Sequence, residues 1–357
     1  MADNYRWLRY ALAGLAAVML VYLVLVANSG ANLAKPEPGM RRFLQLQEEA
    51  TSSAQDASVA NVSSTATTAA TTTTTPKVAV DNTSMRYMHR PGYVVENAGL
   101  CRGNGSQLRV LILVTSAPDH GRHRMAIRFT WGHFSLRKDV AVGFFLGAVE
   151  GDDARQKAVL EEADLYGDVV QSRNADGYRR LPLKTLSLLQ WVDAHCAGAR
   201  FVLKTDDDMF INVEELLRFV RDHADARDTI FGLLARGWKP IRSPDNKYHV
   251  TLEQFPEPVL PDFTTGPAYL LTGDLVRRMH EAALRRRFVP LEDVLFTGLV
   301  AGDVGARRVH SPLFHSVGLG RSRADECKRR ASISVHDVPY EQQFALWGQL
   351  LDGKHAC

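Results

Sequence analysis

From residue 108 onward, short apolar runs alternate with segments in which apolar residues recur at helical spacing. The runs have the length and composition of buried strands, which we expect at 108–115, 140–146, 168–171, 201–203 and 229–235. The periodic segments predict helices at 122–134, 154–165, 183–195, 213–223, 274–287, 291–302 and 340–351. Strands that alternate with helices are typical of an α/β sandwich with a mostly parallel central sheet.

A different pattern occupies the amino-terminal end. Residues 10–27 contain no charged side chain, and Arg6 and Arg9 precede them. This length is just sufficient for a helix to cross a bilayer, and the positive flank predicts a cytoplasmic tail at 1–9 and a lumenal remainder. A cleaved signal peptide ending near 27–29 is the alternative. We favour an uncleaved signal anchor because the apolar run is longer than a usual signal core.

Residues 28–106 are expected to form an extended lumenal stem. The segment 50–76 consists largely of Ala, Ser and Thr, and buries too little apolar surface to offset its chain entropy. Three N-glycosylation acceptor triplets, which begin at Asn61, Asn82 and Asn104, agree with a lumenal stem. A single globular domain is then expected at 107–357.

Charge and cysteine content narrow the function further. The net charge is only +3, which argues against nucleic acid as the main partner. The four cysteines, Cys101, Cys196, Cys327 and Cys357, include no CxxC pair, so a zinc site has little support. In an oxidising compartment they allow three disulfide pairings, which the sequence does not separate.

Three consecutive acids, Asp206, Asp207 and Asp208, follow the expected strand at 201–203. Open α/β sheets bind ligands at the carboxyl ends of their strands. Strand alternation predicts that the first and third acids point to one side, where both can face a divalent cation. Asn212 is expected to cap the next helix, with Glu215 in the capping-box position. A solvated acidic turn before that helix is the structural alternative.

A second acidic pair, Glu292 and Asp293, opens another predicted helix. Acids are common at helix starts because they interact favourably with the helix dipole. A carboxylate there can also act as a general base that removes a proton from an attacking hydroxyl. The chain therefore carries a metal candidate and a base candidate on separate elements.

Five motifs in sequence order resemble the β-1,3-glycosyltransferases, a family of galactosyl-, N-acetylglucosaminyl- and fringe-type enzymes. They are AIRFTW at 126–131, DGY at 176–178 with LKT at 183–185, FVLKTDDDMFIN at 201–212, FP at 255–256 with GPAY at 266–269, and EDV at 292–294 with TG at 297–298. The similarity covers about residues 109–357, and the order and separation of the motifs make it specific. Pro182, Phe263 and the pair 267–268 depart from the family pattern, which weakens any transfer of acceptor identity.

The resemblance implies a GT-A fold, a UDP-sugar donor, a divalent cation (Mn²⁺ or Mg²⁺) and inversion at the anomeric carbon. Asp206 and Asp208 are the expected metal ligands, with Asp208 in direct contact. The similarity of the carboxyl-terminal segment makes His336 the candidate for a third ligand, and His315 is its competitor. Asp293 is the expected catalytic base.

The same resemblance indicates two groups of binding residues. Those expected at the donor are Arg128, Asp176, Lys184 and Asp207. For Arg128, an intrahelical ion pair is the structural alternative. Those expected at the acceptor are Trp238, Phe263 and Tyr269, whose aromatic rings can stack on sugar faces, and Glu292, for which a helix-start charge is the alternative. Simple packing is the alternative for the aromatic residues.

These features predict a Golgi type II membrane hexosyltransferase. We expect it to move a sugar, galactose first, from a UDP-sugar to a glycoprotein or glycolipid acceptor in β-1,3 linkage. N-acetylglucosamine or N-acetylgalactosamine is the alternative donor sugar. A glycosidase would need a carboxylate pair and no metal, and a lectin-like protein would keep the fold without turnover.

Overall fold

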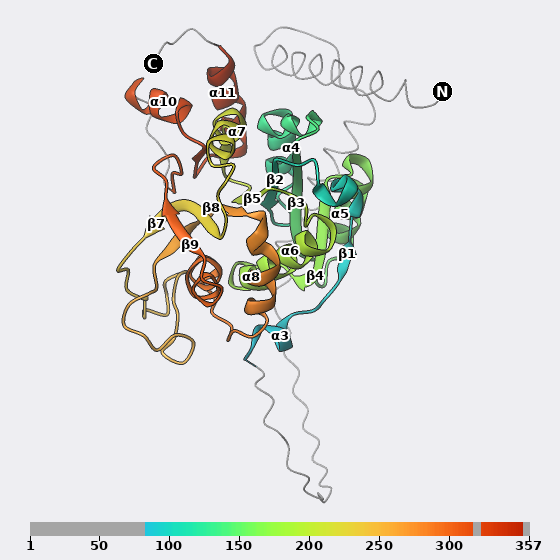
Figure 1. Ribbon diagram of the computed structural model, residues 1–357. Helices are drawn as coiled ribbons and strands as arrows, with labels where there is room; N and C mark the ends of the chain where they lie inside the picture. Colours follow the sequence, from blue (N-terminus) through green and yellow to red (C-terminus); the bar gives the residue numbers. More distant parts are fainter. Residues whose placement is uncertain (1–82, 317–322, 353–357) are drawn as a thin grey trace, which may run out of the picture. The chain divides into compact units, whose positions relative to one another are not determined.

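A computed structural model of the chain describes residues 83–316 and 323–352 (Figure 1). In these ranges an eight-stranded sheet has the order β1-β4-β3-β2-β5-β8-β7-β9, and β10 pairs with β6 in a second sheet. The predicted membrane span at 10–27 and the acceptor residues Asn61 and Asn82 lie outside the described residues. None of the helices in the described ranges combines the length and the apolar character that a membrane crossing requires.

The centre of the large sheet is parallel, as the alternation of strands and helices predicts. Its parallel strands are β2 (Val110–Thr115), β3 (Val140–Ala148), β4 (Val169–Ala175) and β5 (Phe201–Asp206). Antiparallel pairing adds β8 (Phe263–Thr272), β7 (Thr229–Ala235) and β1 (Tyr93–Val95), and β9 (Arg307–His310) runs parallel to β7. The sheet is therefore mixed at both sides of a parallel core.

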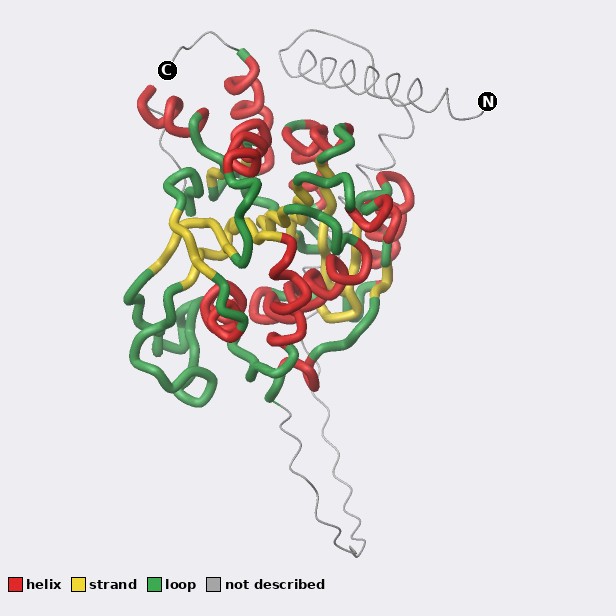
Figure 2. Tube along the Cα trace, in the orientation of Figure 1, coloured by secondary structure: helices red, strands yellow, loops and turns green. Residues whose placement is uncertain are grey.

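Helices cover both faces of this sheet (Figures 1 and 2). One apolar cluster contains Leu111 and Leu113 of β2 together with residues of α6 (Leu181–His195), α8 (Val276–Ala283) and the π-helix Val294–Val300. The other contains Val110, Ile112 and Val114 with residues of α4 (Gly121–Phe129), α5 (Asp153–Tyr166), α7 (Val213–Asp222) and α11 (Tyr340–Leu351). Because successive strand residues point to opposite faces, one continuous apolar strand supplies both clusters.

Besides short 3₁₀ helices, several smaller elements occur in the described ranges. They are the helices α3 (Met85–Met88), α9 (Ala301–Asp303) and α10 (Arg323–Arg330), and the two-residue strands β6 (Phe210–Ile211) and β10 (Ser334–Val335). Residues 236–262, between β7 and β8, run mainly as loop (Figure 2).

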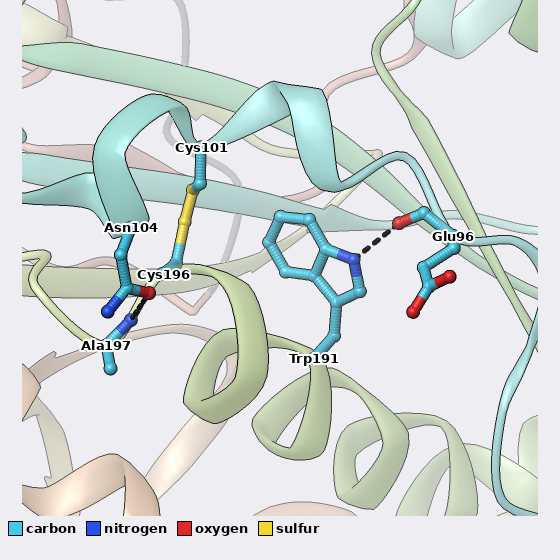
Figure 3. The surroundings of a disulfide bond; sticks show 6 residues. All are labelled: Glu96, Cys101, Asn104, Trp191, Cys196 and Ala197. Carbon is cyan, nitrogen blue, oxygen red and sulfur yellow. Dashed lines mark hydrogen bonds between the residues drawn. A yellow bond between two sulfur atoms is a disulfide. The ribbon is translucent and has the colours of Figure 1, made fainter.

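The stem boundary predicted at residue 106 is wrong, because residues 83–106 are folded against the domain. Strand β1 pairs with β4, and a disulfide joins Cys101 to Cys196 at the end of α6. Figure 3 shows two further ties beside this disulfide: Trp191 Nε1 donates to the Glu96 carbonyl at 2.6 Å, and Asn104 Oδ1 accepts from the Ala197 amide at 3.1 Å. Composition did not reveal these contacts because each partner lies about a hundred residues away in sequence.

Local helix and strand predictions are mostly confirmed. Strand β7 and helix α11 have the bounds expected from the pattern, and Asn212 caps α7 by accepting from the Glu215 amide at 3.3 Å. The Glu215 side chain bonds Arg218 instead of closing a capping box. Strand β8 was missed because Gly266 and Pro267 interrupt its apolar pattern.

Candidate active site

The parallel strands β2, β3, β4 and β5 end at one edge of the sheet, where a cleft of about 390 Å³ opens. Residues 117–119, 148–150 and 175–178 line it, so each of the loops after β2, β3 and β4 contributes. The carboxyl edge of an open α/β sheet is the usual place for such a site. The contacts that hold each loop in place also position the side chains around this edge.

Asp176 lines this cleft, and Lys184 lies behind it in contact with Asp176. The donor contacts expected of both residues stay predictions. Lys184 is buried in α6, and its Nζ lies 2.7 Å from Asp176 Oδ2 and 2.9 Å from the Ser116 carbonyl. Asp176 also accepts from the Gly147 amide at 2.8 Å. A β-carbon at Gly147 would lie 2.7 Å from the backbone of Asp176, so only glycine permits this approach. Lys184 therefore joins two loops of the cleft.

Asp207 has a different place from the one expected. Its buried carboxylate accepts from Ser116 Oγ at 2.6 Å and meets His120 Nδ1 at 2.9 Å. Burial opposes a charged imidazole, but the hydrogen bond to Asp207 raises the pKa of His120 above its ordinary value. Asp207 thus connects the loop after β2 with the turn after β5, and the donor contact expected of it stays a prediction.

Asp206 and Asp208 do not face one another as strand alternation predicts. Strand β5 ends at Asp206, and the chain turns at 207–208, so the two-residue period stops there. Asp206 Oδ1 accepts from Thr115 Oγ1 and from Lys204 Nζ, both at 2.6 Å. The Asp206 side chain keeps 32% exposure.

Asp208 instead meets His336, across the small sheet formed by β6 and β10. His336 Nε2 lies 3.3 Å from Asp208 Oδ2, and His336 Nδ1 donates to the Ser316 carbonyl at 2.9 Å. A carbonyl and a carboxylate oxygen both accept, so each ring nitrogen faces an acceptor. Burial opposes a charged imidazole, but the hydrogen bond to Asp208 raises the pKa of His336 above its ordinary value, which favours the protonated ring that donates from both nitrogens. His315 has no such contact; its backbone amide bonds the Ser334 carbonyl and burial lowers its side-chain pKa.

The predicted three-residue metal site is not assembled in the described ranges, where no three His, Cys, Asp or Glu side chains gather to hold a metal. The pair Asp208 and His336 does fit a divalent cation. Asp208 Oδ1 is buried without a hydrogen-bond partner, which is costly unless a ligand satisfies it. A carboxylate and an imidazole suit Mn²⁺ when other oxygen ligands come from a bound diphosphate.

The donor contact expected of Arg128 is not supported by its surroundings, because two acids away from the cleft lining bind its guanidinium. Its guanidinium forms two hydrogen bonds of 2.7 Å with Asp168 and lies 2.8 Å from Glu162. The rings of Tyr166 and Phe144 lie 4.0 and 4.6 Å from its central carbon. The arginine points to α5 and the start of β4 because two acids and two rings satisfy it there. The intrahelical pair considered for it is wrong, because both acids lie outside α4.

The candidate base Asp293 is half-buried immediately before the π-helix. Its Oδ2 accepts from the Gly266 amide at 3.0 Å and its Oδ1 from the Val294 amide at 2.9 Å. Burial, and then the negative charge of Glu292, raise the pKa of Asp293 to about 6. A carboxylate with this pKa is matched to proton transfer near neutral pH.

Only one of the four expected acceptor residues is well exposed. Trp238 has 55% exposure and packs edge-to-face on the buried Phe263, with ring centres 5.6 Å apart. Tyr269 and Glu292 are buried, and the Tyr269 hydroxyl donates to Glu292 Oε1 at 2.7 Å. Direct acceptor contacts by Phe263, Tyr269 and Glu292 are therefore not supported, because these side chains belong to the interior.

Lys204 was missed by the sequence analysis. It is buried in β5, with Nζ 2.6 Å from Asp206 Oδ1, 2.9 Å from the Gly266 carbonyl and 3.8 Å from Glu292 Oε2. Burial opposes its charge, but Asp206 and then Glu292 raise the pKa of Lys204 above its ordinary value. A lysine within an otherwise apolar strand was the available signal.

Fold and site together define an α/β protein with a cleft at the carboxyl edge of its sheet and a candidate base, Asp293, held by the backbone of β8. Residues 122–312, more than half of the chain, match the family model described as galactosyltransferase. The chain belongs to this family, and its mixed sheet with a parallel core agrees with the GT-A-type fold expected from the resemblance.

Individual relatives carry two kinds of name. Human beta-1,3-galactosyltransferase 2 is 30% identical over 74% of this chain, and the match covers 64% of the relative. Rat UDP-GlcNAc:betaGal beta-1,3-N-acetylglucosaminyltransferase 7 is 30% identical over 67% of this chain and 63% of its own length. The chain thus spans less than two thirds of these curated relatives. The crystal structure of galactosyltransferase LgtC with donor and acceptor sugar analogs has a TM-score of 0.38 at 10% identity, covering 68% of this chain and 96% of that one, which is too distant to carry an argument.

Proposed function

We propose that the protein is an inverting, metal-dependent hexosyltransferase that moves a sugar from a UDP-sugar to a glycan acceptor in β-1,3 linkage. One observation carries the proposal: the buried Lys204 contacts the acid triplet on one side and, on the other, the Gly266 backbone that holds Asp293. Lys204 thereby connects Asp206, at the end of β5, with the backbone that holds the candidate base, and Asp208 of the candidate cation pair follows two residues after Asp206. Family membership supplies the reaction class.

In this proposal Asp293 acts on the acceptor. Its carboxylate takes the proton of the acceptor hydroxyl while that oxygen attacks the anomeric carbon from the side opposite UDP. The bond from the sugar to UDP breaks, and UDP leaves with the electron pair, so the configuration inverts. The two backbone amides that bind Asp293 orient both carboxylate oxygens, and a pKa near 6 leaves the group deprotonated at neutral pH.

Asp208 and His336 are the residues that would hold the cation, Mn²⁺ or Mg²⁺. When bound, such a cation neutralises the departing diphosphate as a Lewis acid. Asp206 is adjacent and partly exposed, which suits a contact to the donor ribose or to a metal-bound water. The cleft lined by Asp176 is the proposed place of the uridine.

Galactose is the first donor sugar to test, and N-acetylglucosamine and N-acetylgalactosamine are the alternatives. Relatives named for galactosyl and N-acetylglucosaminyl transfer are equally similar to this chain at 30% identity. Trp238 is the residue proposed to meet the acceptor sugar, because its exposed ring is backed by Phe263. The acceptor is proposed to be a glycoprotein or glycolipid glycan.

We also propose a Golgi membrane location, with a single type II span at 10–27 and the enzyme domain in the lumen. The uncharged run, its arginine flank and the three acceptor triplets support this placement. The described disulfide between Cys101 and Cys196 is compatible with an oxidising lumen.

The proposed function is tested with a panel of UDP-sugars. The full-length protein in detergent, with Mn²⁺, is offered each sugar together with several β-linked acceptors, and released UDP is measured. We expect acceptor-dependent UDP release with one donor, and loss of that release in EDTA. Turnover that survives EDTA would instead favour a glycosidase-like mechanism. Glycan binding without turnover of any donor would favour the lectin-like alternative.

A further inference from the structure

Lys204 lies between two parts of the site that are far apart in sequence. Its Nζ bonds Asp206 Oδ1, on its own strand, at 2.6 Å. The same atom donates to the Gly266 carbonyl of β8 at 2.9 Å and lies 3.8 Å from Glu292 Oε2. The side chain is only 3% exposed, so water does not screen these contacts.

The backbone of Gly266 links Lys204 to the candidate base Asp293. Its carbonyl accepts from Lys204, and its amide donates to Asp293 Oδ2 at 3.0 Å. Glu292 is fixed on the other side by Tyr269 at 2.7 Å and Thr185 at 2.9 Å. One ammonium group therefore borders the acid triplet, the interior acid and the residue that binds Asp293.

We propose that Lys204 is a positioning residue that holds the acid triplet and Asp293 in one arrangement, and that its positive charge keeps Asp293 deprotonated at neutral pH. The proposal rests on the base role of Asp293 in the proposed function. It assigns Lys204 no contact with donor, acceptor or metal. Its effect is transmitted through Gly266 and through the electrostatic field in a poorly screened interior.

The charges that face Asp293 have opposite signs, which makes the proposal testable. Glu292 raises the pKa of Asp293 after burial, whereas Lys204 lowers it. Tyr178 and Tyr269 are also close enough to interact electrostatically with Asp293. Both are neutral near pH 7 because burial raises their pKa values. Removing Lys204 and removing the charge of Glu292 should thus move the titration of Asp293 in opposite directions.

Two near-isosteric variants of the full-length protein test this: Lys204→Met and Glu292→Gln. The acid limb of the kcat/KM profile should move up by about one pH unit in Lys204→Met and down by a similar amount in Glu292→Gln. The double variant should return close to the wild-type limb. The matched control is Lys184→Met, which removes another buried lysine whose contacts are Asp176 and Ser116, and should leave the limb in place.

A second readout separates this inference from the proposed function. In protein labelled with ¹³C-aspartate, the Asp293 carboxyl signal is assigned by its absence in Asp293→Asn and titrated without substrate. If no UDP-sugar is turned over, the proposed function fails while this titration still tests Lys204. Shifts of one sign in both variants, or none in either, would overturn the proposal. Should Lys204→Met not fold, Lys204→Gln takes its place, because it removes the charge but keeps a donor for the Gly266 carbonyl, and an unmoved Asp293 titration in that variant overturns the proposal.

Discussion

The two buried lysines of the site are held in different ways. Lys184, on α6, contacts one carboxylate, Asp176, and one loop carbonyl, that of Ser116. Lys204, on β5, contacts the carboxylate of Asp206 and lies near that of Glu292. The first region surrounds the cleft, and the second surrounds the candidate base.

Because of this difference, we expect one lysine to affect the geometry of the site and the other to affect the protonation of Asp293. The contacts of Lys184 end on loops that line the cleft, so its main effect is to fix the geometry of the proposed donor site. The contacts of Lys204 end on groups that share negative charge with Asp293, so its main effect is on protonation. A buried charge thus has a role set by what its partners do, and burial alone does not distinguish the two lysines.

The largest expected effect is on the base side. Asp293→Asn keeps an acceptor oxygen for one backbone amide but removes the proton acceptor, so turnover should fall about 10²–10⁴-fold. UDP binding, measured by calorimetry in the presence of Mn²⁺, should change little because the variant leaves the residues that line the cleft intact. Turnover close to that of the wild type would show that Asp293 is not the catalytic base.

The next effect concerns the cation. His336→Ala removes one of the two proposed ligands, and we expect turnover to fall about 10–100-fold, with a higher Mn²⁺ concentration needed for half-maximal rate. His315→Ala is the matched control, since its side chain does not contact Asp208, and should retain the wild-type Mn²⁺ dependence. Equal Mn²⁺ dependence in the two variants would contradict the assignment of His336.

The pH profile gives a smaller graded effect. Asp293 must be deprotonated to accept a proton, and its pKa is raised to about 6. The rate kcat/KM should therefore be constant at neutral pH and fall about tenfold per unit as the pH drops below 6. Profiles between pH 4 and pH 8 measure this. An acid limb with its midpoint near pH 4, the ordinary value for an aspartate, would show that the pKa of Asp293 is not raised.

The smallest effect on turnover is expected outside both regions, at Arg128. Arg128→Met leaves Asp168 and Glu162 partly buried without this cation, which should cost about 3 kcal/mol of folding free energy and leave the donor KM unchanged. Thermal unfolding and donor kinetics measure the two quantities. Lys157→Met, which breaks only an exposed pair with Glu161, serves as the control and should cost less than about 1 kcal/mol. A raised donor KM in Arg128→Met would restore Arg128 to the donor site.

Local patterns accounted for most of the elements. The buried strands, the amphipathic helices and the Asn212 cap depend on residues within one or two turns of each other, so their signals survive in the sequence. Motif order was enough to recognise the family, which the match over 122–312 confirms. The same motifs pointed to the acid triplet and to Asp293.

Side-chain partners required the tertiary structure. The sequence analysis expected the first and third of the three consecutive acids to act together, but Asp206 bonds Lys204 on its own strand. The turn after β5 then places Asp207 against His120 and Asp208 against His336. The acids that pair with Arg128 lie on another helix and at the start of a strand. Residues 83–106 are held by strand pairing with β4 and by the disulfide.

The sequence by itself thus determined the α/β pattern, the family and the identity of the chemically active residue types. The tertiary structure decided which charges meet, which aromatic rings are buried and where the folded chain begins. The physical reason is range: helix and strand signals arise between near neighbours, whereas electrostatic and packing energies depend on distances in space that the order of residues does not record.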